Sequence, residues 1–489
     1  MVPAGLCHLF LWRGLKTVAD FIPPHPPRLR RPPPPWQRLK LARRNFIAMW
    51  EASAFELEFS SEQVLARRTF LCNCPEAVQF AFSLHNASFE RKAPQMRHAL
   101  EPLIGDGLFI SDGETWRQRR KLVAPILHAS RLAGFSKVMV ETATEMRQRW
   151  AQRAGIDALE EMARLTAEII SRTIFGGELG HEHAGEVVAG FTDYQRTIGQ
   201  IDLIAFLGLP DWVPRWHSPA VWFAQRRIHR VLDHIIARYK ARAAAGETSV
   251  IGQLLDARDD EGRPLSPEAL RNEVAVLFMA GHETTANTLA WAWFLLSQCP
   301  EAEEKLHAEL DAVLGGRPPT LRDIRNLPYT QAVIEETLRL YPPVPILPRE
   351  ALREETFRGE RIPKGSLLFV VPWLLHRHRR LWDRPDHFVP ERFLPGSREP
   401  VSKFAYVPFS IGPRVCAGQS FGLTEAILCL ATLAQSFALR LKPGHDVQPV
   451  CRLTLRPDGG LPMTVVKRTP AMAAASTTDS PAGCPFGHA

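Results

Sequence analysis

The sequence predicts a mainly α-helical protein that folds as one large domain with small β-sheets. Three observations support this fold class: apolar residues follow the helical period from about Asn45 onward, one predicted helix is far longer than average, and the strand-like runs are short. A hydrophobic fraction of 45% with 23% charged residues is ordinary for a globular protein and supplies a sizeable core. We find no internal repeat.

The clearest helix is predicted over Ser266–Gln298. Ser266 can accept a hydrogen bond at the N-cap, Pro267 suits the first helical position, and Glu268 places a negative charge in the first turn. Such a helix is roughly 50 Å long at 1.5 Å per residue. Because it is apolar over most of its length, we expect it to cross the middle of a large domain.

Shorter elements are expected towards the C-terminus. They are two helices and four strand-like runs: Pro300–Leu314, about Pro328–Tyr341, Thr356–Ile362, Ser366–Val371, Arg452–Leu455 and Met463–Lys467. Glycines at 359 and 365 indicate turns, so we expect short paired strands around them.

The predicted domain spans residues 45–468. A chain of 489 residues would suggest about three domains by length alone, but no internal linker is found. Residues 1–44 form a Pro/Arg-rich lead-in, in which Pro23–Pro35 is expected to be extended rather than packed. Residues 469–489 are small and polar and are expected to be disordered.

A short apolar run, Leu6–Trp12, lies near the N-terminus. It is shorter than the roughly 20 apolar residues of a membrane-spanning helix, so we expect no transmembrane anchor. No secretory signal pattern surrounds it. A short helix at a membrane surface is the alternative interpretation.

The net charge of +8 raises the question of a nucleic-acid partner. The basic residues are dispersed, however, and the two local runs, Arg28–Arg31 and His376–Arg380, do not alternate with stacking aromatic residues. We therefore expect no nucleic-acid partner. The runs are interpreted as solvated surface, with a docking face for an acidic redox partner as the alternative.

The eight cysteines show neither zinc-type spacing nor a dense disulfide pattern. Cys72 and Cys74 are therefore interpreted as incidental or buried thiols, and a reducing cytoplasm is the expected location. Cys416 differs, because it lies in a glycine-bracketed loop just before a helical run, Leu423–Phe437. Unpaired amides near a helix N-terminus favour a thiolate, which can ligate a metal.

The loop Phe409-Ser-Ile-Gly412-Pro-Arg414-Val-Cys416-Ala-Gly418 carries the pattern F-x-x-G-x-R-x-C-x-G. This pattern resembles the haem loop of the cytochrome P450 family at every defining position. The resemblance implies the mainly α fold of that family with haem b (iron protoporphyrin IX) between the long helix and the cysteine helix. It also implies that Cys416 is the iron ligand and the only metal-binding residue.

A second motif, Ala280-Gly-His-Glu-Thr-Thr285, lies inside the long predicted helix. The Thr284 hydroxyl can bond back to the Ala280 carbonyl, which bends helices, and Gly281 removes side-chain bulk. The run resembles the family's acid–alcohol pair. The resemblance implies that Thr284 steadies the reacting oxygen and that Glu283 feeds protons towards it, in a local opening of the helix.

Two further sets of residues fit the resemblance. Glu336 and Arg339, with Arg392 some fifty residues later, resemble the family's buried Glu–Arg–Arg network, whose role is structural. The residues that resemble the partners of the haem propionates are Trp116, Arg120, Arg349 and Arg414. For Arg120 and Arg349, a surface arginine is the alternative interpretation.

The function implied by the resemblance is monooxygenation of a small apolar organic substrate with dioxygen. The chain looks like a soluble bacterial-type member without a fused reductase, acting as a monomer. Its electrons would then come from an external donor, a ferredoxin with its NAD(P)H-dependent reductase. A peroxygenase or isomerase and a non-catalytic haem protein are the alternatives. The substrate pocket is expected at Phe89–Phe109, Phe278–Thr285 and Pro345–Leu347, and Cys484 before Pro485 is interpreted as an incidental thiol.

Overall fold

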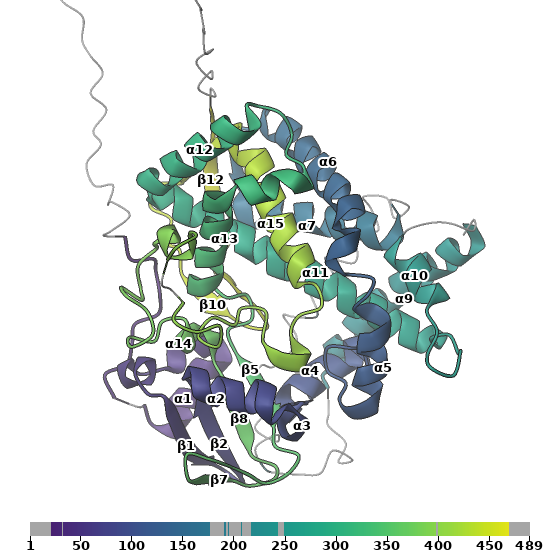
Figure 1. Cartoon of the computed structure of the whole chain (residues 1–489), viewed down its shortest axis with the longest axis vertical. Helices are drawn as coiled ribbons and strands as arrows, with labels where there is room; N and C mark the ends of the chain where they lie inside the picture. Colours follow the sequence, from purple (N-terminus) through teal and green to yellow (C-terminus); the bar gives the residue numbers. More distant parts are fainter. Residues whose placement is uncertain are drawn as a thin grey trace, which may run out of the picture.

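The computed structural model describes residues 21–176 except 32, residues 217–242, 249–397 and 400–468, and residues 190, 191, 194 and 207. The apolar run Leu6–Trp12, the predicted tail 469–489 and Cys484 lie outside these residues. The prediction of a mainly α fold with small sheets is confirmed (Figure 1).

Helices make up most of the described chain. The α-helices are α1 (Pro35–Arg44), α2 (Pro75–Gln79), α3 (Asn86–Phe89), α4 (Pro94–Ile104), α5 (Gly113–Val123), α6 (Leu132–Trp150), α7 (Ala158–Phe175), α9 (Pro219–Arg242), α10 (Val250–Asp256), α11 (Pro267–Gln298), α12 (Pro300–Leu314), α13 (Pro328–Leu340), α14 (Pro372–Leu375) and α15 (Gln419–Ala434). Short 3-10 turns include η7 (Pro390–Phe393) and η8 (Gly412–Arg414), and η3 (Phe80–Leu84) is a π turn.

The long helix α11 is confirmed with its predicted start. The Ser266 hydroxyl accepts a hydrogen bond from the Ala269 amide at 3.1 Å, which satisfies one free donor of the first turn. The helix runs through the middle of the helical part in Figure 1 and packs against α7, α13 and α15. Near its end the Trp291 ring stacks on Tyr341 with 3.8 Å between ring centroids. The core of the protein is therefore built around α11.

The largest sheet has the strand order β1-β2-β8-β5-β3, in which only β2 and β8 are parallel. Its strands are β1 (Phe59–Val64), β2 (Arg67–Cys72), β3 (Arg91–Lys92), β5 (Leu347–Glu350) and β8 (Leu367–Val370). The smaller sheets pair β4 (Gly155–Asp157), β12 (Pro462–Lys467) and β9 (Phe437–Leu441); β10 (Pro449–Cys451) and β11 (Leu455–Pro457); and β6 (Glu355–Phe357) and β7 (Glu360–Ile362).

The predicted strands are partly confirmed. The turn at Gly359 joins β6 to β7, and Arg358 and Gly359 have φ of 50° and 79°, as a tight hairpin requires. The run after Gly365 becomes β8, which pairs with β2 and β5. The predicted strand Arg452–Leu455 is mostly wrong, because the antiparallel pairing of Cys451 with Leu455 turns the residues between them into a reversal.

The prediction that Pro23–Pro35 does not pack is wrong. The segment is extended, but Phe21 just before it is buried, the Tyr341 hydroxyl donates to the Pro24 carbonyl at 2.7 Å, and Arg28 pairs with Asp386. Prolines lack amide donors, so this backbone makes few internal hydrogen bonds and its carbonyls accept from side chains of the body. None of the helices in the described ranges is both long and apolar enough to cross a membrane.

The interpretation of His376–Arg380 as solvated surface is wrong for its first three residues and holds for its last two. His376, Arg377 and His378 are buried, and Arg379 and Arg380 form ion pairs with Glu56 and Glu58 of the segment before β1. The first three residues therefore pack inside the protein, while Arg379 and Arg380 stay exposed and pair with acids on the surface.

Candidate active site

The cysteine loop is shaped by a close approach of two backbones. Gly412 has φ of 74°, and a Cβ at this position would lie 1.9 Å from the carbonyl oxygen of Phe82 in η3. Only glycine fits there. The turn closes through hydrogen bonds from the Val415 amide to the Gly412 carbonyl at 3.0 Å and from the Cys416 amide to the Phe409 carbonyl at 2.9 Å. The first fixed glycine of the motif therefore places Cys416 just before α15.

Of the six cysteines in the described ranges, Cys416 alone keeps accessible surface. Burial nevertheless raises the pKa of its thiol, while the Gly418 amide and the charges of Arg120 and Lys92 act in the opposite direction. A sulfur that is accessible yet surrounded by protein faces internal space. The helix N-terminus alone does not make this group a thiolate, but a bound metal ion would, because coordination removes the thiol proton.

A cluster of buried cations lies near this sulfur. Lys92 of β3 and Arg349 of β5 are opposite each other in the antiparallel pair and are 6% and 1% exposed. Burial and then the charge of Arg414 lower the pKa of Arg349 to about 9. The pKa of Lys92 lies well below its usual value, first through burial and then through the charges of Arg349 and Arg414. Two like charges in register destabilise a sheet unless an anion joins them.

Arg414 links the cysteine loop to α5. Its guanidinium lies 4.7 Å from the ring centroid of Trp116 and donates to the Glu90 carbonyl at 2.7 Å. Burial lowers the pKa of Arg414 to about 10, and the Arg120 charge acts in the same direction. Burial also lowers the pKa of Arg120, which the charge of Cys416 opposes. The structure thus brings Trp116, Arg120, Arg349, Arg414 and Cys416 together, and Arg349 is not a surface arginine.

This cluster fits the two propionates of haem. Within the described ranges, no carboxylate forms an ion pair with Lys92, Arg120 or Arg349, and the buried Nη2 of Arg349 has no hydrogen-bond partner. Unpaired buried charges are costly, so the cations require an anionic partner. A dianionic ligand beside an accessible sulfur would supply one.

The motif in α11 is only partly as predicted. Thr284 does bond back to Ala280, with 2.7 Å between its hydroxyl and that carbonyl. Ala280 is exposed although it lies in the middle of a mostly buried helix, so it faces internal space. A Cβ at Gly281 would lie 2.7 Å from Ile170 Cδ1, so this glycine permits close packing on α7. The helix is continuous through this motif.

Glu283 has a partner that the motif does not contain. The Thr454 hydroxyl, from the residues before β11, donates to Glu283 Oε1 at 2.6 Å. The motif also meets the cysteine helix, because a Cβ at Gly422 of α15 would lie 3.8 Å from Thr285 Oγ1. Phe278, one of the expected pocket residues, is instead fully buried between Phe191 and His282.

The predicted Glu–Arg–Arg network is confirmed. Arg339 binds Glu336 through two hydrogen bonds of 2.6 and 2.8 Å, and Arg392 Nε lies 3.2 Å from Glu336 Oε1. All three side chains are at most 6% exposed. Arg339 also donates to the carbonyls of His376 and His387, at 2.7 and 2.8 Å. The network therefore anchors the segment that leads to the cysteine loop.

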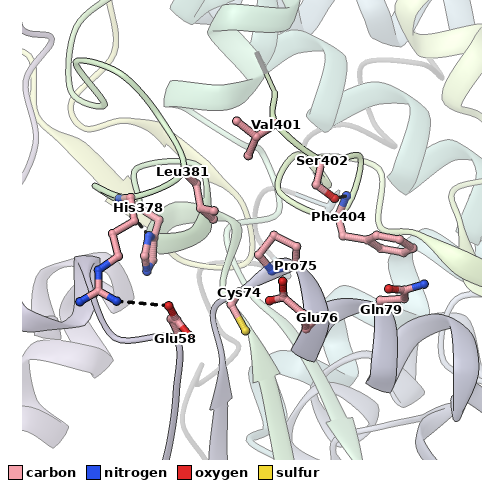
Figure 2. A pocket seen from close by; sticks show the side chains of 11 residues that line it. Glu58, Cys74, Pro75, Glu76, Gln79, His378, Leu381, Val401, Ser402 and Phe404 are labelled. Carbon is pink, nitrogen blue, oxygen red and sulfur yellow. Dashed lines mark hydrogen bonds and ion pairs between the residues drawn. The ribbon is translucent and has the colours of Figure 1, made fainter. Parts of the chain in front are cut away.

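A separate cavity of about 410 Å³ lies between the start of the first sheet and the residues before the cysteine loop (Figure 2). It is lined by Glu58, Cys74, Pro75, Glu76, Gln79, His378, Arg380, Leu381, Val401, Ser402 and Phe404. The Glu58–Arg380 ion pair crosses its edge. No residue predicted for the site lines it, so this cavity is not the active site.

Comparison with known proteins agrees with this geometry. A family model described as Cytochrome P450 matches residues 35–462, which is most of the chain. The chain belongs to the cytochrome P450 family. Members of this family are haem-dependent oxidoreductases and typically monooxygenases, so haem is the cofactor and dioxygen, a substrate and a redox partner are implied.

Relatives in this family come from distant organisms. Cyclooctatin synthase of Streptomyces melanosporofaciens is 36% identical over 397 residues, covering 80% of this chain and 84% of that protein. Cytochrome P450 4V2 of Rattus norvegicus is 32% identical over 402 residues, covering 76% and 75%. A cytokinin hydroxylase of Arabidopsis thaliana is 32% identical over 402 residues, covering 79% and 77%.

Solved P450 structures share the fold. The heme domain of cytochrome P450DA superposes with a TM-score of 0.78 and 24% identity, covering 92% of this chain and 99% of that one. Retinoic acid-bound cyanobacterial CYP120A1 superposes with a TM-score of 0.74 and 26% identity, covering 84% and 92%. The first likeness concerns the fold alone.

Sequence reasoning missed three residues of this P450 site and its support. Lys92, Thr454 and His376 belong to no motif. The structure identifies Lys92 because it pairs with Arg349 across the sheet, and Thr454 because it donates a hydrogen bond to Glu283. The Nε2 of His376 accepts from the Val407 amide at 2.9 Å, and burial lowers the pKa of this histidine to about 3, so it is neutral. The only sequence signal for His376 was a run interpreted as surface.

Proposed function

We propose that this P450 is a haem-thiolate monooxygenase that inserts one atom of dioxygen into a small apolar organic substrate. The observation that carries the proposal is the set of unpaired buried cations around the accessible sulfur of Cys416. That arrangement suits a dianionic, metal-bearing ligand and has no evident structural purpose.

In this proposal Cys416 supplies the iron ligand, and the propionates are held by Lys92, Trp116, Arg120, Arg349 and Arg414. A thiolate-ligated haem, when bound, uses two electrons and two protons to cleave dioxygen and transfers one oxygen atom to the substrate. The protein contributes the orientation and the anion-binding charges. Burial makes these charges effective, since low dielectric surroundings weaken screening.

The proposed roles of Glu283 and Thr284 follow from their hydrogen bonds. The Thr284 hydroxyl donates a hydrogen bond to the Ala280 carbonyl. Its oxygen therefore remains an acceptor that can bind water or a protonated group beside α11. The half-buried Glu283 carboxyl lies one residue away and can pass protons along that side of the helix. These two residues are the proposed catalytic pair.

The substrate class rests on the apolar surroundings and on the relatives. Leu108, Phe109 and Ile346, within the expected pocket segments, are buried or half-buried. One relative is named as a hydroxylase and one structure contains retinoic acid. A hydroxylation of an apolar compound is consistent with both.

We further propose that the electrons come from a separate ferredoxin with its NAD(P)H-dependent reductase, and that the protein acts as a cytoplasmic monomer without nucleic acid. The basic excess of +8 would attract an acidic donor. The rate of electron transfer is then expected to fall as salt rises. A rate that does not depend on ionic strength would count against an acidic donor.

One experiment tests the function. The purified protein is reduced under carbon monoxide, and we expect the red-shifted band of a thiolate-ligated haem. Ferredoxin, its reductase and NADPH are then added with labelled dioxygen and the compound that shifts the haem spin state most. We expect one labelled oxygen atom in the product. Product formed from peroxide but never from dioxygen would identify a peroxygenase instead. A carbon monoxide band without the red shift would show that no thiolate ligates the haem iron.

The role of Thr284 has its own test. Thr284→Ala is expected to keep consuming oxygen and NADPH while releasing more hydrogen peroxide and about 100-fold less product, the lower end of the range that general acid catalysis contributes. Thr432→Val is the control, because the Thr432 hydroxyl bonds only within α15, to the Leu428 carbonyl at 2.7 Å. Unchanged product yield in Thr284→Ala would remove this residue from the mechanism.

A further inference from the structure

Glu283 is held by a three-residue chain of side chains that joins α11 to the reversal before β11. Thr454 Oγ1 lies 2.6 Å from Glu283 Oε1 and 3.1 Å from Asn287 Nδ2. Glu283 and Asn287 are one helical turn apart, so they share a face of α11. Thr454 and Asn287 are 7% and 2% exposed. The contact is therefore largely shielded from solvent.

The chemistry of the three groups sets the direction of the hydrogen bonds. The amide nitrogen of Asn287 can only donate, so the Thr454 oxygen accepts from it. A hydroxyl has one proton, and the Thr454 proton is thus directed to Glu283 Oε1. This order suits an ionised Glu283 carboxylate, whose oxygen accepts.

We propose that Thr454 is a positioning residue for Glu283, holding one carboxylate oxygen and so fixing the orientation from which the carboxyl group delivers protons. The inference rests on the proposed function, because it matters only if Glu283 delivers protons. Thr454 does not conduct protons itself, since the amide behind it does not release one. Its contribution is to keep the long, flexible Glu283 side chain in a single orientation, which the helix alone does not do.

The test uses the haem-loaded protein with ferredoxin, its reductase and NADPH, and the compound with the largest spin-state shift as substrate. Thr454→Val removes the hydroxyl at nearly constant volume, and Thr454→Ser keeps it. Thr432→Val is the matched control, a buried threonine whose hydroxyl bonds only within its own helix. For each variant, product and hydrogen peroxide are measured per NADPH consumed, together with the solvent isotope effect on product formation.

We expect Thr454→Val to lower the product yield about fivefold and to change the solvent isotope effect, with KM for the substrate unchanged. Thr454→Ser should lie within about twofold of the unchanged protein, and Thr432→Val should match it. If Thr454 had only a structural role, Thr454→Val would lower the amount of folded protein. It would change neither the solvent isotope effect nor the ratio of product to hydrogen peroxide formed per NADPH. An unchanged ratio of product to hydrogen peroxide in Thr454→Val would overturn the inference.

A second measurement does not depend on catalysis. The unfolding midpoints of Thr454→Val, Glu283→Gln and the double variant form a double-mutant cycle. We expect the shift of the double variant to be smaller than the sum of the two single shifts, because each single change already breaks the same contact. Additive shifts would show that the side chains do not interact and would overturn the positioning role.

The two proposals fail differently. If Thr284→Ala loses product but Thr454→Val does not, the proposed function stands and the inference is wrong. If the unchanged protein incorporates no oxygen from dioxygen, both are wrong, whatever the cycle gives.

Discussion

The protein contains two clusters of buried arginines, and they differ in how their charges are met. Around Glu336, Arg339 and Arg392 are satisfied by a carboxylate and by backbone carbonyls. Around Cys416, Arg349 has an unpartnered Nη2 and lies opposite Lys92. Arg339, Arg392, Arg349 and Lys92 are all at most 6% exposed, so burial does not distinguish the two clusters.

The difference separates a structural network from a ligand site. A buried charge that finds all its partners in the protein stabilises the fold as it stands. A buried cation without a partner in the protein is tolerated only if a bound ligand neutralises its charge. The satisfied network should therefore matter to folding, and the unsatisfied cluster should matter to haem retention.

Breaking the satisfied network should have the largest effect. Glu336→Gln removes the carboxylate that Arg339 and Arg392 share and should lower the free energy of unfolding by about 3–5 kcal/mol. Chemical denaturation measures the change. Glu301→Gln is the control, because Glu301 pairs with Lys305 on the surface of α12. A loss below about 1 kcal/mol would mean that the network is not structural.

The next largest effect concerns a buried acid. Glu425 of α15 is fully buried, and burial raises the pKa of its carboxyl to about 8. The Thr285 hydroxyl opposes this shift, although it makes no hydrogen bond to either carboxyl oxygen. Glu425 is thus the acidic counterpart of the unsatisfied cations, and it avoids the cost of burial by keeping its proton.

Because the folded protein holds this proton more tightly than the unfolded chain, its stabilising contribution is complete below pH 4.5 and is lost as pH rises through 8. Glu425→Gln should remove that dependence. Relative to the variant, the unchanged protein is expected to lose on the order of 3 kcal/mol between pH 5 and 8. Chemical denaturation of both proteins at several pH values tests this expectation. If the free energy of unfolding depends on pH in the same way in both, the expectation is wrong.

Removing a cation from the unsatisfied cluster should have a smaller and different effect. Arg349→Met is expected to speed haem loss about 10–100-fold, equivalent to one charged hydrogen bond, while the haem-free protein keeps its stability. Transfer of haem to a scavenger protein measures the rate. Arg379→Met is the control. If Arg349→Met destabilises the haem-free protein and loses haem at the normal rate, Arg349 stabilises the fold and does not bind the haem.

Surface pairs should matter least. Arg379→Ala removes the ion pair with Glu56, whose two side chains are 45% and 46% exposed. We expect a change below about 1 kcal/mol in the free energy of unfolding, and less at high salt. A larger loss would show that the segment Arg379–Arg380 takes part in the packing through its charges.

The long helix, the cysteine loop and the network around Glu336 could be predicted from the sequence. These depend on local chemistry and on the fixed spacing of a few residue types: a serine cap, glycines with positive φ, and an acid and base one turn apart. Even so, the reason for Gly281 was only partly visible, since its neighbour Ile170 comes from another helix.

The partners of the site residues, in contrast, depend on tertiary contacts. Lys92 contacts Arg349, Thr454 contacts Glu283, and residues 376–378 are buried instead of solvated, all through contacts between segments far apart in the chain. Residue type and local pattern carry no information on such contacts. Whether a buried charge is satisfied is set by what the fold places beside it, and that is what separates the haem site from its scaffold.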